Sequence, residues 1–297
     1  TLYDVAIINE NNIWAVGEIM IADTSLNGYT TYNAVHWDGN QWELKRIPYY
    51  FNNQTFYGAI RAIFAFKEND IWFGTGNMIH WNGIDYISVY VGLGMTINKI
   101  WGSSNQDVYI VGNNGSIAHY NGSNWQRIES GTTLSINDIW GDFNEKTQEW
   151  EILAVASNVN SGVERALIEI KNNFAQDISY NPIQWSLKTL WFKSTKHYFI
   201  AGSGIYEKHL LTEKLWKNEP LDITTFYINK IRANNINDVV GIGAFGDLVH
   251  FNGLKWKTDY VEPELNFGSY LSVDIKNNIL VTVGLENNQA VIFLGVR

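Results

Sequence analysis

The sequence predicts an all-β protein, a seven-bladed β-propeller of four-stranded antiparallel blades, and three observations support this prediction. Two short patterns recur seven times along the chain, with a period of about 40 residues. The segments between them are short runs rich in Ile, Val, Trp and Tyr, separated by Asn, Asp, Gly and Ser, which is typical of strands and turns. No run has the length and period of an amphipathic helix.

The first pattern is a small residue that ends an apolar run, as in NIWAVG, DVYIVG and HYFIAG. Its members are Gly17, Thr75, Gly112, Ala156, Gly202, Gly243 and Gly284. We expect each to end the second strand of a blade.

The second pattern, apolar-x-x-apolar, comes some fifteen to twenty residues earlier, as in INKIW at 97–101 and INDIW at 136–140. Apolar residues three apart cannot share one face of a regular strand, so both faces are predicted to be buried. An innermost strand between two neighbouring blades has this property. The third unit is then predicted to hold strands at 96–101, 107–112, 116–120 and 125–129.

The last unit supplies only three strands, at 270–275, 279–285 and 289–294, whereas the first unit begins directly with its innermost strand at Leu2. We therefore expect an incomplete last blade, with its fourth strand supplied by residues upstream of Thr1. The alternative is a stacked open solenoid. That architecture needs polar capping repeats, and the end units show none.

Composition narrows the classes of function. The 297 residues show no change midway, which predicts a single propeller domain over 1–297. A net charge of −9 without a Lys/Arg run argues against nucleic acid. No apolar run approaches the roughly 20 residues of a membrane helix, and no cysteine is present for disulfides or thiol chemistry. The surplus of Asn, Ser, Thr and aromatics predicts an extracytoplasmic protein, whether secreted, periplasmic or on the cell surface.

A histidine motif recurs beside the predicted hairpins, as in AHYNGSNW at 118–125. His36, His80, His119 and His250 lie near the ends of four different third strands, and His209 is a fifth candidate. Equivalent positions lie on a ring around a propeller, so these histidines are predicted to be far apart and to have structural roles rather than to bind one metal. His197 has no evident partner.

The residues around each histidine predict local structure. Asp-Gly or Asn-Gly predicts a two-residue hairpin turn with positive φ, and the aromatic three residues later begins the fourth strand. These aromatics are Trp42, Tyr86, Trp125 and Trp256, with Trp216 as a possible fifth. The polar residues Asn12, Asp70, Asp107 and Asp238, which precede the second strands, are predicted to be Asx-type turn residues.

The segment NDIWFGTGNMIHWNG at 69–83 resembles the repeats of bacterial β-propeller families, those of two-component regulators and of the streptogramin-lyase-like group. The resemblance extends over nearly the whole chain and implies the propeller fold. Streptogramin lyases are expected to present histidine and carboxylate pairs on one face, and no such pair is evident. Sialidase, quinoprotein and kelch signatures are also absent, which argues against an enzyme.

One candidate site follows the predicted axial strands. Asn98, Asn137 and Asn229 share one column, with Asp138 beside it, and such oxygen ligands suit a divalent cation. The column is interrupted by Tyr3, Arg61, Lys188 and Leu271. We therefore favour a solvated channel lining without metal or cofactor. The alternative function is a propeller lyase or lactonase-like hydrolase with a divalent cation in the axial channel.

A second candidate is the face formed by loops from the fourth strand to the next blade and from the second strand to the third. The loop PYYFNNQTFYG at 48–58 contains the predicted ligand-binding residues Tyr49, Tyr50, Phe51, Phe56 and Tyr57, beside a long insertion at 18–31. Tyr180, Trp185, Phe226, Tyr227 and Phe267 fall in equivalent connections. Exposed aromatics anchor peptides or stack on sugar rings. The predicted function is thus a non-catalytic binding or scaffold module for a protein or carbohydrate ligand.

Overall fold

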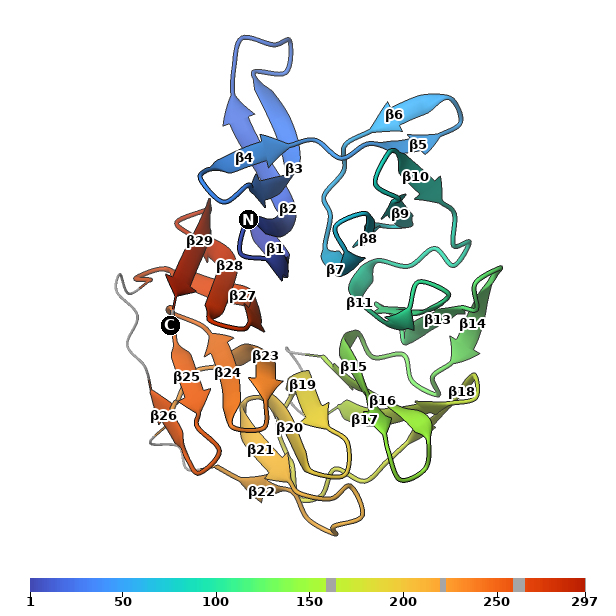
Figure 1. Ribbon diagram of the computed structural model, residues 1–297, viewed down its shortest axis with the longest axis vertical. Helices are drawn as coiled ribbons and strands as arrows, with labels where there is room; N and C mark the ends of the chain where they lie inside the picture. Colours follow the sequence, from blue (N-terminus) through green and yellow to red (C-terminus); the bar gives the residue numbers. More distant parts are fainter. Residues whose placement is uncertain (159–163, 220–222, 259–264, 297) are drawn as a thin grey trace.

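The computed structural model describes residues 1–158, 164–219, 223–258 and 265–296, and it confirms the seven-bladed propeller (Figure 1). Six sheets have four antiparallel strands in meander order, and the seventh has three. The first strand of every blade contacts the first strands of both neighbouring blades, so these strands form a closed ring around the axis. None of the described residues belongs to a helix that could cross a membrane.

The strands follow the blades in chain order. Blade 1 contains β1 (Leu2–Asn9), β2 (Asn12–Ala22), β3 (Tyr29–Trp37) and β4 (Trp42–Lys45); blade 2 contains β7 (Ala62–Lys67), β8 (Asp70–Gly74), β9 (Met78–Trp81) and β10 (Tyr86–Val89); blade 3 contains β11 (Ile97–Ser104), β12 (Asp107–Gly112), β13 (Ser116–Tyr120) and β14 (Trp125–Glu129). Blade 4 contains β15 (Ile136–Asn144), β16 (Glu149–Ser157), β17 (Arg165–Lys171) and β18 (Phe174–Asp177); blade 5 contains β19 (Leu187–Lys193), β20 (His197–Gly202), β21 (Gly204–Lys208) and β22 (Lys217–Asn218). Blade 6 contains β23 (Ile228–Asn235), β24 (Asp238–Gly243), β25 (Leu248–Phe251) and β26 (Trp256–Thr258), and blade 7 contains β27 (Gly268–Lys276), β28 (Ile279–Glu286) and β29 (Gln289–Val296). A separate hairpin, β5 (Tyr49–Phe51) and β6 (Gln54–Phe56), connects blades 1 and 2.

The small residue of the repeat lies opposite the start of the first strand, but it ends the second strand only at Gly112, Gly202 and Gly243. The second strand continues past Gly17, Ala156 and Gly284, and it stops one residue before Thr75. A Cβ added to Gly112 would lie 2.1 Å from the Thr96 carbonyl oxygen, and one added to Gly243 would lie 2.1 Å from that of Tyr227. Gly17, Gly202 and Gly284 have the same close approach. At these five glycines the backbones of the first two strands are in contact, which leaves no room for a side chain; blades 2 and 4 have Thr75 and Ala156 at this position instead.

The apolar-x-x-apolar pattern has a different cause from the one predicted. Ile97 and Ile100 belong to one core cluster, and so do Ile136 and Ile139. The pairing of β11 with β12 shifts between Ile97 and Lys99, and equivalent shifts occur in blades 1, 4, 5, 6 and 7. An extra residue in one strand inverts the alternation of side chains, so residues three apart do share a face. The expectation that they cannot was wrong.

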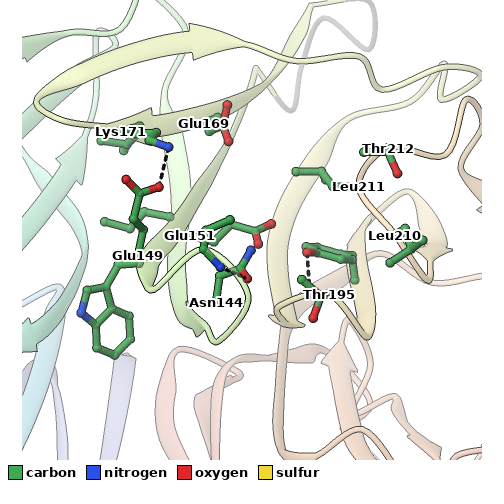
Figure 2. A pocket seen from close by; sticks show the side chains of 14 residues that line it. Asn144, Glu149, Glu151, Glu169, Lys171, Thr195, Leu210, Leu211 and Thr212 are labelled. Atoms are coloured by element: carbon green, nitrogen blue, oxygen red, sulfur yellow. Dashed lines mark hydrogen bonds and ion pairs between the residues drawn. The ribbon is translucent and has the colours of Figure 1, made fainter.

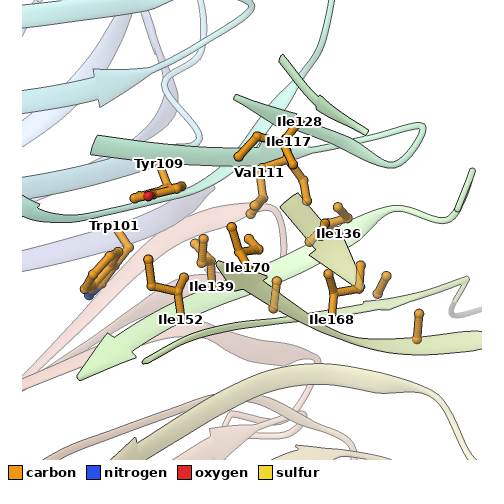
Figure 3. Packing of buried hydrophobic residues seen from close by; sticks show 14 of the residues in the cluster. Trp101, Tyr109, Val111, Ile117, Ile128, Ile136, Ile139, Ile152, Ile168 and Ile170 are labelled. Carbon is orange, nitrogen blue, oxygen red and sulfur yellow. The ribbon is translucent and has the colours of Figure 1, made fainter. Parts of the chain in front are cut away.

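The hydrophobic core consists of clusters between adjacent blades, and each of the seven interfaces has one. Figure 3 shows the cluster between blades 3 and 4, where Val111 and Ile117 face Ile139 and Ile168. Both faces of these sheets are covered, so the sequences of the strands are nearly continuous runs of apolar residues. The ring is held together by burial at every interface.

The Asp-Gly and Asn-Gly hairpins join third and fourth strands as predicted, but the turn is longer. Trp37 pairs with Trp42, which leaves residues 38–41 in the turn, and the Asp38 N–H donates to the Gln41 carbonyl. Only the glycine has positive φ, 97° at Gly39, while the Asp38 carboxylate accepts from two turn N–H groups. The polar side chain thus caps the turn instead of supplying a second left-handed residue.

The last blade has the three strands expected of it. Strand β1 is the innermost strand of blade 1, and no strand within the described ranges pairs with the outer edge of β29. The alternative pairing, residues 1–8 as the outermost strand of the last blade, does not occur. Figure 1 places the chain start beside β29.

Candidate functional site

Four histidines form one repeated structural unit. His36, His80, His119 and His250 lie on third strands of separate blades, as predicted. Each pairs through Nε2 with the residue that begins the second strand, over distances of 2.7–3.0 Å, and the partners are Asn12, Asp70, Asp107 and Asp238. Those residues were predicted to cap turns, and their pairing with histidine was missed.

Aromatic stacking completes the unit in blades 1, 2 and 3, whereas Val240 pairs with His250 in blade 6. The Tyr109 and His119 rings stack with centroids 4.1 Å apart, and the rings of Trp72 and His80 lie 4.3 Å apart. Burial acts to raise the pKa of Asp107, but hydrogen bonds from His119 and Ser103 outweigh it and hold that pKa below its usual value. A paired and stacked imidazole in each of several blades is a packing element, not a metal site.

Blade 5 contains the same pair with its members exchanged. His197 begins β20, where the other blades have an acid or amide, and its Nε2 lies 3.0 Å from the Glu207 carboxylate on β21. Phe199 pairs with Glu207 as Tyr109 pairs with His119. The sequence-based conclusion that His197 lacks a partner was wrong, because the exchanged order hides the repeat. A search for either order would have found it.

The polar axial column lines one end of the axial channel. A cavity of about 140 Å³, which we call the channel mouth, lies at this end. It is lined by the ring residues Tyr3, Arg61, Asn98, Asn137, Lys188, Asn229 and Leu271, together with Asp4 and Lys230. Six of the seven ring positions lie at the bulges of the first strands. The bulge therefore directs the ring residue toward the axis while its apolar neighbours stay in the core.

The three asparagines of the ring bind the next blade. Asn98 Nδ2 donates to the Ile136 carbonyl at 2.9 Å, Asn137 Nδ2 to that of Leu187 at 3.0 Å, and Asn229 Nδ2 to that of Tyr270 at 2.7 Å. These residues were predicted as candidate cation ligands. Their amide groups connect neighbouring blades across the mouth.

Below the mouth, Asp138 is the centre of one buried ion-pair network. Its carboxylate accepts two hydrogen bonds from Arg232, at 2.8 and 3.0 Å, one from Lys230 at 3.2 Å and one from Thr189 at 2.7 Å. Burial opposes ionisation of Asp138, but the charges of Arg232 and Lys230 outweigh it and hold its pKa well below the usual range. Burial lowers the pKa of Lys230 to about 7.

Asp4 is the centre of a second network. It accepts from Lys99 at 2.7 and 2.9 Å, from Ser272 at 2.6 Å and from the Ile63 N–H at 3.0 Å. Among the described residues no group of three or more His, Asp or Glu side chains is arranged to hold a metal ion. The carboxylates of Asp4 and Asp138 are already bound by lysine and arginine, so they do not form a free set of oxygen ligands for a cation.

The predicted aromatic loop forms the β5–β6 hairpin, which lies against β10 of blade 2 (Figure 1). Tyr50 is 52%, Phe51 46% and Phe56 43% exposed. Tyr49 and Tyr57 are partly buried, and the Arg46 guanidinium covers the Tyr57 ring at 3.8 Å. Arg46 also donates to the Thr31 carbonyl on β3, so the long β2–β3 insertion does adjoin this loop.

More exposed aromatics lie at the end of the ring that contains the mouth. We call this end the loop face; it is formed by the connections that lead into each first strand and by the turns between second and third strands. Phe226, Phe245 and Phe267 form an aromatic patch there: the Phe226 and Phe245 centroids lie 5.0 Å apart, and the Phe245 N–H donates to the Gly268 carbonyl next to Phe267. Phe245, which sequence reasoning missed, has a φ of 59° and is 51% exposed.

A groove of about 250 Å³ lies between blades 4 and 5 at the opposite end (Figure 2). Figure 2 shows Glu149 bound to Lys171, with Leu210 and Leu211 on the far wall. Glu151 accepts from Ser194 and Glu169 from Gln176. Each acidic side chain of the groove thus has a partner within the protein, although Glu151 Oε1 is buried without a hydrogen bond.

The comparisons with known proteins show a similarity of fold and none of sequence family. No family model and no curated protein sequence matches the chain. A structure titled "YCF48 bound to D1 peptide" is similar, with a TM-score of 0.70 at 16% identity over 100% of this chain and 93% of that chain. YCF48 from Cyanidioschyzon merolae has a TM-score of 0.68 at 12% identity, over 100% and 95% of the two chains.

The WD40 β-propeller domain of Doa1 has a TM-score of 0.72 at 13% identity, over 98% of this chain and 91% of that chain. At these identities the likeness concerns architecture. The resemblance to the bacterial regulator and streptogramin-lyase-like repeats is not confirmed beyond the propeller itself. By its fold the chain is a seven-bladed β-propeller with an incomplete last blade.

Proposed function

We propose that the chain is a non-catalytic protein-binding module that holds an extended peptide segment on the loop face. The observation that carries this proposal is the exposure of large aromatic side chains there: Trp185 is 59%, Phe226 43%, Phe245 51% and Phe267 79% exposed. Exposed aromatic groups with polar surroundings are typical of protein interaction sites. The partner of YCF48 in its complex is a peptide, which supports this class of ligand for the fold.

The asymmetry of the face also supports a specific ligand. The β2–β3 insertion and the β5–β6 hairpin break the repeat on one side, and the aromatic patch occupies another part of the ring. Tyr50, Phe51 and Phe56 on the hairpin are the second set of proposed contacts. A carbohydrate ligand, which the sequence also allows, would stack on the same rings, and an extracytoplasmic location stays a prediction.

The test is peptide selection followed by measurement of individual peptides. Peptides selected from a random displayed library are synthesised, and their affinities for the wild type, Phe226→Ala, Phe267→Ala and Phe51→Ala are measured by calorimetry. Loss of an aromatic anchor costs about 2 kcal/mol or more, roughly thirtyfold in affinity. Phe174→Ala is the matched control, because Phe174 is 67% exposed but follows a turn at the opposite end of its blade.

At least one loop-face variant is expected to weaken binding while the control does not. Selected peptides that bind all three loop-face variants as tightly as the wild type contradict the proposal. A glycan array probed in parallel separates the two ligand classes, because glycan binding without peptide binding also contradicts it.

A further inference from the structure

We propose that the channel mouth is an anion site that receives a carboxylate group of the bound peptide, either its C-terminus or an Asp or Glu side chain. This inference rests on the proposed function, since it names the chemistry of the partner. It starts from three cationic side chains, Arg61, Lys188 and Lys230, which come from three different blades and line one cavity.

Among the described residues the side chains of Arg61 and Lys188 form no ion pair, although the Asp138 charge acts on Lys188 from a distance and partly offsets the effect of its burial. Arg61 is exposed and its guanidinium lies over the Tyr3 ring, 4.8 Å from the centroid, which fixes its position without supplying a negative charge. Lys188 is partly buried and, within the described ranges, forms neither a hydrogen bond nor an ion pair. Burial lowers its pKa, so its charged form is held at a cost that an anion would offset.

The charge balance of the channel has the same sign. Its walls carry the cations Arg61, Lys99, Lys188 and Arg232 and the carboxylates Asp4, Asp138 and Asp274. Lys230, with a pKa of about 7, adds a charge that is only partly present at neutral pH. Asp274 is buried, which raises its pKa. The axis is therefore cationic inside a protein with a net charge of −9. Low-dielectric walls concentrate such a field and attract a ligand of opposite charge.

The size of the mouth limits the ligand to one small group. A cavity of 140 Å³ corresponds to about four or five water molecules. That volume admits a carboxylate with some of its water but excludes a folded segment. The aromatic patch adjoins the same opening, because Asn229 in the ring donates to Ser269, two residues beyond Phe267. A peptide anchored on the patch therefore has its neighbouring residues at the mouth.

The probe is pentaglutamate, with amidated pentaglutamine as the counterpart that has no carboxylate, and binding is measured by calorimetry at low ionic strength. The mouth variant is Arg61→Gln/Lys188→Gln. The control, Lys146→Gln/Lys196→Gln, removes the same charge from exposed lysines in turns at the opposite end. We expect pentaglutamate to bind the mouth variant at least tenfold more weakly than the wild type, about 1.4 kcal/mol, and the control as tightly as the wild type.

Urea denaturation verifies that both variants are folded. Absence of pentaglutamate binding to the wild type, equal affinity in the mouth variant, or equal binding of pentaglutamine overturns the anion site. Tighter binding of inorganic phosphate than of pentaglutamate overturns the assignment to a carboxylate. A selected peptide that depends on Phe226 and Phe267 but not on Arg61 and Lys188 overturns only this inference, and the proposed function stands.

Discussion

Single polar residues on the axis carry charges that the fold must stabilise. Asp138 is fully buried, and Arg232 and Lys230, its partners from blade 6, are 4% and 6% exposed. Such ions are costly to take out of water, and what they add to stability depends on complete pairing. Removing one member leaves the others uncompensated.

Replacement of Asp138 by Asn is expected to lower the free energy of unfolding by about 3–5 kcal/mol, because Arg232 and Lys230 lose their shared counter-charge. Urea denaturation measures the loss. Glu145→Gln, at an exposed position of the turn that follows β15, is the control. A loss no larger than that of the control would show that the axial ion pair contributes little to stability.

At the scale of an element, the exchanged pair of blade 5 makes a prediction about pH. Burial acts to raise the pKa of Glu207, but hydrogen bonds from His197 and Lys217 outweigh it and lower the pKa to about 2, against 4.5 ordinarily. A carboxyl with a lowered pKa stabilises the fold above pH 4.5, and this stabilisation is lost as pH falls from 4.5 to 2. Glu207→Gln should therefore be less stable at neutral pH and lose less stability across that window.

The reversed order itself can be tested by a double exchange. His197→Asp/Glu207→His gives blade 5 the order found in blades 2, 3 and 6, at register positions that match. We expect the double variant to retain more of the wild-type free energy of unfolding than Glu207→Gln does. Equal losses in the two variants would show that the pair depends on its surroundings in blade 5.

The regular strands could be predicted from the sequence, but the bulges and the tight turns could not. The second, third and fourth strands of blade 3 begin and end where the sequence places them, because Asn, Asp and Gly mark their turns. The bulge at Asn98 produces the apolar-x-x-apolar spacing, but a strand was assumed to be regular, so the faces of the first strands were misread. Phe245 is inconspicuous in sequence because its exposure depends on a tight turn that pairs with blade 7.

At the scale of the whole molecule, the sequence predicted which residues form the axial column but not its charge. Asn98, Asn137 and Asn229 suggest oxygen ligands when read as a column. The pairing of Asp4 with Lys99 and of Asp138 with Arg232 joins residues 95 and 94 positions apart, which no local pattern reveals. Closure of the ring brings these charges together, so the sign of the net charge along the channel can be seen only in the folded structure.

The burial of Lys230 inside the closed ring predicts that the free energy of unfolding rises above neutral pH. The pKa of Lys230 is about 7 in the folded protein, against 10.5 ordinarily. Between pH 7 and 10.5 the unfolded chain therefore binds a proton at this lysine that the folded protein has lost. The charged groups around Lys230 are Asp138, Arg232, Lys99, Asp4 and Lys188. The free energy of unfolding then increases with pH across this window, by an amount on the order of a few kcal/mol.

Lys230→Met should flatten this rise, because the titrating ammonium is gone, whereas Lys146→Gln at an exposed turn should keep it. Denaturant titrations at several pH values between 7 and 10 provide the comparison. Parallel curves for the wild type and Lys230→Met would mean that the proton of Lys230 does not influence folding.

The two axial networks divide the ring into arcs. Asp4 bonds directly to groups in blades 2, 3 and 7, and Asp138 to groups in blades 5 and 6, so one arc comprises blades 7, 1, 2 and 3 and the other blades 4, 5 and 6. The seams between the arcs are crossed at the mouth by Asn98 and Asn229. Both seams also contain hydrophobic clusters, so contact between the arcs depends on apolar packing and amide hydrogen bonds, whereas each arc is also linked by buried ion pairs. A change of pH, which acts on ion pairs, should therefore alter the cohesion within each arc more than the contact between the arcs.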